Sequence, residues 1–181
     1  MKVLLHLADG FEEIEALSTL DILRRADIDT TTVSIMGKKE VKSARGMLVQ
    51  ADQVIENINY EDYDMIILPG GPGTALLDQH DELKNQLKNY ASKDKWIAAI
   101  CAAPSVLGKL NLLNGKRAVC YPGYEDDLLG AQVSLNDKVL VDGKIITSRG
   151  PGTSFDFAFK VVETLKGSKT VDELKVKMLM S

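Results

Sequence analysis

The chain has 181 residues, 45% of them hydrophobic and 27% charged, which is the composition of an ordinary globular protein with a core of its own. The formal net charge of −4 and the lack of a basic run disfavour nucleic acid as a partner. No stretch approaches the ~20 apolar residues of a membrane span or the apolar core of a signal sequence, so we expect one domain, residues 1–181, in the cytoplasm.

In the first half of the chain, short apolar runs alternate with a helical pattern. Residues 3–7 are predicted to form a buried strand that ends at Asp9-Gly10, and a helix is predicted from residue 11 or 12 to residue 25, with Ile14 on its buried face. The β-branched residues at 30–36 predict a second strand, and residues 38–55 are polar with strand-like pieces near 41 and 47–49. Residues 64–68 form a third apolar run, which stops at Pro-Gly-Gly-Pro-Gly.

The second half continues the alternation. The pattern predicts a surface helix over residues 80–91, a strand over 96–100 that leads into a helix from residue 102, and a short strand over 117–121. Asp142-Gly143 between two apolar runs predicts a hairpin. Thr153 and Thr170 each precede an acidic residue by three positions, which predicts two capped helices, the first with Phe155 on its buried face. This alternation predicts an α/β fold, a doubly wound and mostly parallel sheet with helices on both faces and a small hairpin.

At one position a strand turns directly into a helix at a cysteine. The run from Trp96 to residue 100 has strand length, and Pro104 fits the first turn of the helix, where its missing N–H needs no partner. Cys101 occupies the turn itself, with Ala99 and Ala103 two positions to either side. Small residues at that spacing are what a nucleophile elbow requires, because the backbones crowd there.

Two interpretations of Cys101 follow. Unpaired N–H groups and the positive end of the helix dipole favour the thiolate, which predicts a thiol pKa below the usual value of about 8.5. A single cysteine among alanines and isoleucines is also a common buried hydrophobic residue. The choice depends on what the fold brings near the sulfur.

Two other unusual segments also follow predicted strands. Such segments gather at one edge of a parallel sheet, so the acidic run at 12–15 and the pair Gly70-Gly71 are expected beside Cys101. The glycines and Ala102 offer backbone N–H groups for an oxyanion hole, although a plain tight turn explains Gly70-Gly71 as well.

The three glutamates of the acidic run are expected to differ in orientation. All of them suit the first turn of a helix, where the dipole favours carboxylates. Glu12 and Glu13 are predicted to point outward, whereas Glu15 lies on an inward row. Burial would raise the pKa of Glu15, so that it stays protonated and donates a hydrogen bond to a thiolate.

The histidines argue against several other activities. His6 lies inside the first strand and His80 opens a surface helix, so no histidine follows Cys101 to form a Cys–His pair. The sequence has neither a His-Glu-x-x-His motif nor a cluster of cysteine and histidine ligands. We therefore expect no metal and no cofactor.

Four motifs give the chain a family resemblance. They are ADGFEEIEA at 8–16, LPGGPG at 68–73, AAICAAP at 98–104 and TSRGPGTSFDFA at 147–158, in this order over nearly the whole length. Together they resemble the ThiJ/PfpI superfamily and, within it, the parkinsonism-associated deglycase (DJ-one-like) branch. The resemblance implies a flavodoxin-like homodimer in which Cys101 is the oxidation-prone nucleophile and Glu15 is its protonated partner.

The resemblance also implies roles for other residues. The N–H groups of Gly71 and Ala102 would line the site. The residues that would support the site or the dimer contact near it are Gly70, Arg45, Arg149 and Gly150. The implied activities are removal of methylglyoxal-type glycation adducts, glyoxalase chemistry without a cofactor, redox sensing and chaperoning.

Two positions depart from the family pattern. The branch commonly has His before Pro near the site, and this chain has Tyr121 before Pro122, so Glu15 or water must move the protons that the histidine would move. PfpI-type proteases have His directly after the cysteine, and Ala102 at that position argues against peptidase activity.

The second cysteine is adjacent to one of these positions. Cys120 precedes Tyr121 and is therefore expected near Cys101. It is either a buried strand cysteine or a resolving thiol that condenses with a Cys101 sulfenic acid to form a disulfide. The buried cysteine is the better-supported interpretation.

Three functions remain open. The first is a cofactor-independent deglycase or glyoxalase, in which the Cys101 thiolate adds to the carbonyl of methylglyoxal, glyoxal or an early glycation adduct and Glu15 moves protons. The second is a redox-sensing chaperone whose Cys101 is oxidised to a sulfinate. The third is a binder of small molecules whose Cys101 has an ordinary thiol pKa. We favour the first.

Overall fold

The computed structural model describes residues 1–180 and is built on a seven-stranded sheet in the order β10-β11-β7-β6-β1-β2-β5. The strands of this sheet are β1 (Lys2–Leu7), β2 (Asp29–Ser34), β5 (Gln53–Val54), β6 (Met65–Leu68), β7 (Trp96–Ile100), β10 (Val139–Asp142) and β11 (Ile145–Ser148). Neighbouring strands are parallel except in the β10–β11 hairpin. Two small sheets pair β3 (Glu40–Lys42) with β4 (Leu48–Gln50), and β8 (Arg117–Ala118) with β9 (Gln132–Val133).

The helices between these strands are short or of moderate length. They are α1 (Glu13–Arg25), α2 (Thr74–Gln79), α3 (Asp81–Ser92), α4 (Pro104–Lys109), α5 (Ser154–Lys166) and α6 (Ser168–Lys177), with single 3-10 turns at Ile55–Asn57, Tyr60–Asp62, Glu125–Asp127 and Pro151–Thr153. None of the helices within residues 1–180 combines the length and the apolar character that crossing a bilayer requires.

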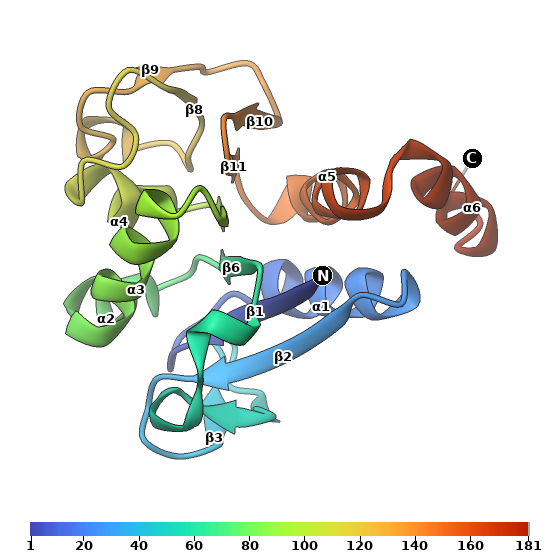
Figure 1. The fold of residues 1–181 in the computed structure, drawn as a ribbon, viewed down its shortest axis with the longest axis horizontal. Coiled ribbons are helices and arrows are strands. Elements are labelled where there is room, and N and C mark those ends of the chain that lie inside the picture. Colours follow the sequence, from blue (N-terminus) through green and yellow to red (C-terminus); the bar gives the residue numbers. More distant parts are fainter. Residues whose placement is uncertain (181) are drawn as a thin grey trace.

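The core lies on both faces of the sheet, because successive residues of a strand point to opposite sides. On β1, Leu5 packs in a cluster with Ile22 of α1 and Phe157 of α5, whereas Leu4 packs in a second cluster with Leu87 of α3. Helices α1, α5 and α6 cover one face, and α2, α3 and α4 cover the other (Figure 1). The predicted α/β fold with helices on both faces and a hairpin is confirmed.

The strand order determines where a ligand can bind. The chain runs from β1 outward to β2 and then returns to β6 on the other side of β1, so the strand order reverses between β1 and β6. Ligands of such sheets bind outside the carboxyl ends of the strands at this point. The carboxyl ends of β1, β6 and β7 are neighbours in the sheet, and the three segments singled out in the sequence follow them.

Thr153 occupies the N-cap position of α5, as predicted, but neither Thr153 nor Thr170 makes the predicted capping hydrogen bond. The Thr153 hydroxyl accepts from the Gly150 N–H at 3.1 Å and lies 2.7 Å from the Ser148 hydroxyl, so it closes the turn before α5 instead of capping the helix. Thr170 lies within α6, where its hydroxyl donates to the Lys166 carbonyl at 3.2 Å. In both cases the hydroxyl bonds to another nearby group of the chain and accepts no N–H from the first turn of the helix within residues 1–180.

Three further helix predictions need correction. Ile14 is 50% exposed and Phe155 is 42% exposed, so neither belongs to a buried helix face. The helix after Cys101 begins at Pro104, two residues later than expected. Helix α2 is absent from the sequence-based prediction, because its six residues are too few to display a helical period.

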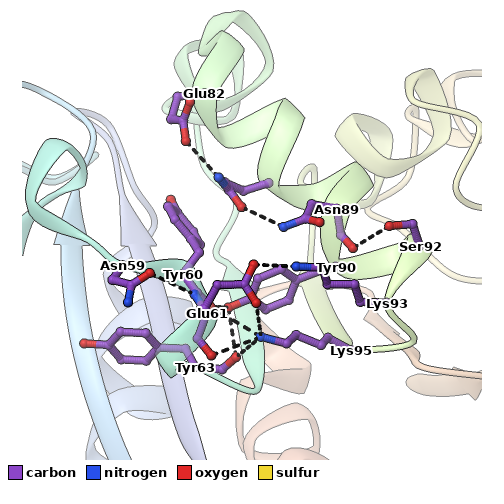
Figure 2. Close-up of polar contacts among 11 residues, drawn as sticks. Asn59, Tyr60, Glu61, Tyr63, Glu82, Asn89, Tyr90, Ser92, Lys93 and Lys95 are labelled. Atoms are coloured by element: carbon purple, nitrogen blue, oxygen red, sulfur yellow. Dashed lines mark hydrogen bonds and ion pairs between the residues drawn. The ribbon is translucent and has the colours of Figure 1, made fainter.

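A polar cluster closes the amino-terminal edge of the sheet, just before β6 and β7 (Figure 2). The Lys95 ammonium group donates to the carbonyls of Tyr63 at 2.9 Å and Glu61 at 3.3 Å, and it lies 5.0 Å from the centre of the Tyr90 ring. The Tyr90 hydroxyl donates to the Tyr60 carbonyl at 2.9 Å. These bonds satisfy backbone carbonyls in a segment that forms no strand or α-helix.

Candidate active site

Cys101 occupies a sharp turn between β7 and α4, as predicted. Its φ angle of 67° lies in the left-handed region, which residues with a side chain rarely adopt. The Cys101 N–H donates to the Ser148 carbonyl at 2.9 Å, and the Cys101 carbonyl accepts from the Tyr121 N–H at 2.8 Å. These two long-range hydrogen bonds hold the strained turn in place, as a nucleophile elbow requires.

Backbone N–H groups surround the sulfur. Those of Gly71 and Ala102 donate toward Cys101 Sγ and favour its thiolate form. The sequence predicted both residues as donors. Because α4 starts at Pro104 and has only six residues, these two N–H groups rather than a long helix dipole provide the electrostatic support.

The Glu15 carboxyl is the other group beside the sulfur. Glu15 is 1% exposed, and its Oε2 accepts from the Gly70 N–H at 2.7 Å, while Oε1 has no hydrogen-bond partner among residues 1–180. Burial, the largest cause, raises the pKa of Glu15 to about 7, although the Cys101 thiol and the Gly70 N–H act in the opposite direction. The inward orientation and the raised pKa of Glu15 agree with the sequence-based expectation.

The thiol itself differs from the expectation of a low pKa. Burial and the neighbouring Glu15 carboxylate raise the pKa of Cys101 to about 12, against the effect of the two N–H donors. Burial is the larger cause, and a thiolate next to an ionised Glu15 would in addition put two negative charges side by side. At pH values between the two pKa values, Glu15 and Cys101 together therefore carry one proton. The thiolate forms when that proton moves from Sγ to Glu15.

Glycines allow the chain to close around these two side chains. A Cβ atom on Gly70 would lie 2.8 Å from Glu15 Oε2 and 3.0 Å from Cys101 Sγ. Gly71 has a φ of 89°, and a Cβ there would lie 2.6 Å from a backbone oxygen. Gly150 faces Sγ from the other side, where a Cβ would lie 3.9 Å from the sulfur. Gly70 is therefore required for close packing around the sulfur and Gly71 for close approach of the backbone, whereas a Cβ on Gly150 would make only an ordinary contact with the sulfur.

Tyr121 forms the exposed rim of the site. A Cβ on Gly150 would lie 3.0 Å from the edge of the Tyr121 ring, so the ring covers the glycine that faces the sulfur. The Tyr121 side chain is 46% exposed. The residue therefore supplies an exposed wall beside the glycine that faces the sulfur.

Glu13 is buried, and its predicted outward orientation is wrong. It is 6% exposed and accepts hydrogen bonds from the Ser43 hydroxyl and from the Arg45 N–H, the latter at 2.5 Å. Burial alone would raise its pKa, but the Ser43 hydroxyl and Arg45 outweigh it and hold the pKa of Glu13 below its usual value. Glu13 thus anchors the β3–β4 turn beside the start of α1, and Arg45 contributes both its backbone N–H and the charge of its exposed side chain. Ser43 was missed because it is distant in sequence and belongs to no motif.

Arg149 and Cys120 lie on the outer side of the elbow. The Arg149 guanidinium donates to the Leu135 carbonyl at 2.5 Å and lowers the pKa of the Cys120 thiol, although burial and acidic neighbours raise that pKa to about 11. Cys120 packs in the hydrophobic cluster of α3 and α4, whereas Cys101 packs in the cluster on the opposite face. This placement favours the interpretation of Cys120 as a buried cysteine, but not as a strand residue, because β8 ends at Ala118 and the predicted strand over 117–121 is shorter than expected.

The histidines take no part in the site. His6 Nε2 lies 2.8 Å from the Tyr60 hydroxyl in the core, and burial lowers the pKa of His6 to about 3. His80 accepts the Leu83 N–H at 3.3 Å at the start of α3. No group of three or more histidine, cysteine, aspartate or glutamate side chains within residues 1–180 is arranged to hold a metal ion.

Fold and site together define a class of protein: an α/β domain in which a cysteine on a nucleophile elbow faces a buried glutamate at the carboxyl edge of a parallel sheet. Residues 1–164 match the DJ-1/PfpI family. The chain belongs to the DJ-1/PfpI family, and the sequence-based resemblance is confirmed.

Individual relatives cover the chain almost completely. DJ-1 homolog B of Arabidopsis thaliana is 36% identical over 181 residues, which are 99% of this chain and 41% of that protein. The glutathione-independent glyoxalase DJR-1.2 of Caenorhabditis elegans is 34% identical over 164 residues, 90% of this chain and 87% of the relative. The solved structure of oxidized DJ-1 from Toxoplasma gondii has a TM-score of 0.94 and 37% identity, and the match covers 99% of this chain and 98% of that one. The flavodoxin-like fold is thereby confirmed.

Proposed function

We propose that this protein is a cofactor-independent glyoxalase and deglycase that acts on methylglyoxal, glyoxal or early glycation adducts. The observation that carries the proposal is the buried Glu15 carboxyl beside Cys101, with a pKa raised to about 7. A group with that pKa both gives and takes protons near neutral pH. The similarity to a glutathione-independent glyoxalase of C. elegans supports the assignment.

The first step is addition of the sulfur to the aldehyde carbon. A proton moves from Sγ to Glu15, the thiolate forms a C–S bond, and the carbonyl π bond breaks. The developing negative charge on oxygen is stabilised by the N–H groups of Gly71 and Ala102. Glu15 then returns its proton to that oxygen, which gives a hemithioacetal.

The second step moves hydrogen between two carbons. The Glu15 carboxylate removes the proton from the former aldehyde carbon, and the electron pair forms a C–C double bond while the ketone π electrons move to the ketone oxygen. That oxygen takes the hydroxyl proton of the first carbon, whose oxygen becomes the thioester carbonyl as Glu15 returns its proton to the neighbouring carbon. The product is a thioester of lactate, which water hydrolyses to lactate with release of the thiol. Oxidation of one carbon balances reduction of the other, so the net reaction consumes only water. With an amine adduct, the thiolate displaces the amine, which leaves with a proton from Glu15.

Lactate formation tests the proposal. Purified protein is incubated with methylglyoxal, and lactate is measured for the wild type, Cys101→Ser and Cys120→Ser. We expect turnover in the wild type and in Cys120→Ser, and a loss of at least about 10³-fold in Cys101→Ser, because the nucleophile is missing. Lactate formation that survives in Cys101→Ser would refute the mechanism.

We also infer that the protein forms a homodimer next to this site. Ile14, Met47 and Leu48 are exposed by 50%, 47% and 63%, and Glu13 ties the start of α1 to the β3–β4 turn that carries the last two. Exposed apolar side chains gathered in this way are typical of a protein interface. Light scattering of the wild type and of Ile14→Glu tests the inference: a monomeric wild type contradicts it, and we expect the variant to dissociate.

A redox sensor is the second candidate, and one observation favours it. The related Toxoplasma structure is described as oxidized, and in this chain the N–H groups of Gly71 and Ala102 lie where sulfinate oxygens on Cys101 would accept hydrogen bonds. This candidate predicts negligible aldehyde turnover together with a gain of two oxygen atoms on Cys101 at low peroxide concentration. Peptide mass spectrometry beside the lactate assay separates the two functions.

A further inference from the structure

Helix α1 begins without a side-chain cap. Its N-cap residue, Glu12, has an extended backbone and makes no side-chain hydrogen bond to the first turn. A helix start without such a bond leaves N–H groups unpaired and frays more readily. Glu15, the buried acid beside Cys101, lies in this first turn, so its position depends on the other contacts that hold the turn in place.

Gly70 provides one attachment for the first turn. The Glu12 N–H donates to the Gly70 carbonyl at 3.0 Å, and the Gly70 N–H donates to Glu15 Oε2 at 2.7 Å. The helix itself starts with a hydrogen bond from the Ala16 N–H to the Glu12 carbonyl at 3.0 Å. A displacement of the turn would therefore change how the Glu15 carboxyl lies against Gly70 and against Cys101, which packs on the same glycine.

The Glu13 carboxylate provides a second attachment. Its Oε1 accepts hydrogen bonds from the Ser43 hydroxyl and from the Arg45 N–H, which belong to the turn between β3 and β4. That turn closes a hairpin and has an attachment of its own, since the Ala44 N–H donates to the Phe11 carbonyl at 2.9 Å. The Glu13 bonds therefore connect the start of α1 to a segment that is held independently of them.

We propose that Glu13 is a positioning residue, which holds the first turn of α1 so that the Glu15 carboxyl stays buried beside Cys101. Within residues 1–180, the ionisable neighbours that shift the pKa of Glu15 are Cys101 and Glu12, so Glu13 acts through position and not through its charge. The effect of Glu13 on catalysis rests on the proposed function, whereas its effect on the position of Glu15 does not.

The titration of Glu15 tests the proposal without turnover. Burial is the largest cause of its raised pKa of about 7, so a first turn that frays into water should let this pKa fall toward the ordinary glutamate value of 4.5. Carboxyl carbon chemical shifts are followed by NMR during a pH titration of the wild type, Glu13→Ala and Glu13→Gln. We expect a midpoint for Glu15 of about 6 or lower in Glu13→Ala. Glu13→Gln keeps an oxygen that accepts the same two hydrogen bonds, and its midpoint should stay near that of the wild type.

Two further variants complete the titration. Ser43→Ala removes one of the two donors and should lower the Glu15 midpoint by a smaller amount, which keeps the test decisive if Glu13→Ala does not fold. Asp21→Ala is the matched control, because Asp21 is an exposed acid of the same helix whose partner is Arg25, and it should leave the midpoint unchanged. An unchanged midpoint in Glu13→Ala and Ser43→Ala would overturn the proposal. Equal shifts in Glu13→Gln and Glu13→Ala would also overturn it, because they would show that the charge matters and not the hydrogen bonds.

Hydrogen exchange and kinetics measure the two consequences separately. The Ala16 N–H closes the first turn, so we expect its amide hydrogen to exchange at least about threefold faster in Glu13→Ala, and unchanged exchange would overturn the proposal. In the same variant, kcat for methylglyoxal should fall about tenfold while KM stays within about twofold, because the proton carrier is displaced and the sulfur is not. A wild type that converts no methylglyoxal would refute the proposed function instead, and the titration would still decide the role of Glu13.

Discussion

The two edges of the same sheet handle polar groups in opposite ways. At the amino edge, the Lys95 ammonium group donates to several backbone carbonyls, and the Tyr90 hydroxyl donates to another (Figure 2). At the carboxyl edge, Glu15 Oε1 and the Thr74 hydroxyl are buried without partners among residues 1–180. Satisfied polar groups stabilise a fold, whereas unsatisfied ones reduce its stability and are retained where a ligand or a reaction uses them. We therefore expect the polar groups of the amino edge to contribute to stability and those of the carboxyl edge to contribute to catalysis.

The same contrast extends to charge. At the amino edge, Lys93 and Lys95 both lie close to Glu61, so opposite charges are paired. At the carboxyl edge, the two ionisable groups, Glu15 and Cys101, are both acids and repel each other when ionised. Repulsion between buried acids keeps one proton on the pair, and this proton is what the proposed chemistry moves.

The largest expected effect is that of removing the acid at the carboxyl edge. Glu15→Gln keeps the shape and removes the proton carrier, so we expect kcat/KM for methylglyoxal to fall about 10²–10⁴-fold. The folded protein should remain as stable as the wild type or become more stable, because a buried carboxyl with an unpartnered oxygen has been replaced. Steady-state kinetics and urea unfolding of the same sample measure both quantities. Retention of full activity would show that Glu15 moves no proton in the rate-determining steps.

The next largest expected effect is the change of activity with pH, which depends on the two acids at the carboxyl edge. Below the raised pKa of Glu15, about 7, the pair holds two protons and no thiolate is available. As the pH rises through that value the pair loses one proton, so kcat/KM should rise about tenfold per pH unit up to about 7 and then level off. Rates between pH 5 and 9 measure this, and Glu15→Gln should lack the inflection near 7. A flat profile from pH 5 to 7 would contradict the shared-proton account.

A substitution at the amino edge should have the opposite result: it should lower the stability of the protein and leave its catalytic activity unchanged. Lys95→Met leaves partly buried carbonyls without a donor, so we expect the free energy of unfolding to fall by about 1–3 kcal/mol while kcat/KM stays within twofold. Lys93→Met is the matched control, since the Lys93 ammonium group donates to the exposed Glu61 carboxylate and to no backbone carbonyl within residues 1–180, and it should destabilise the protein less. Equal losses in both variants would mean that the carbonyl contacts contribute little.

Local patterns predicted much of this architecture. The apolar runs that form β1, β6 and β7 were identified, because strands buried on both faces need continuous apolar sequence. Cys101 was identified by the small residues two positions away, which the tight turn demands. The inward orientation of Glu15 was predicted from helical spacing.

The features that the sequence did not predict depend on contacts between distant segments. Glu13 turns inward because Ser43 and the Arg45 N–H, some thirty residues away, bind its carboxylate. Thr153 follows the pattern of a helix cap, but Gly150 and a neighbouring hydroxyl bond to it instead. The Cys101 pKa follows from burial and from Glu15, which only the folded chain brings together.

The smallest expected effect concerns Cys120. It tests whether a second cysteine takes part in the chemistry of Cys101 at the carboxyl edge. Burial raises the pKa of the Cys120 thiol to about 11, so almost no thiolate is present to attack a sulfenic acid at neutral pH. Its side chain also packs in the cluster on the other face of the sheet from Cys101. We therefore expect peroxide to oxidise Cys101 without forming a Cys101–Cys120 disulfide, and Cys120→Ala to change kcat/KM less than twofold. Non-reducing peptide mapping checks the first expectation. A disulfide-linked peptide pair would show that the elbow opens far enough for the two sulfurs to meet, and would restore Cys120 as a resolving thiol.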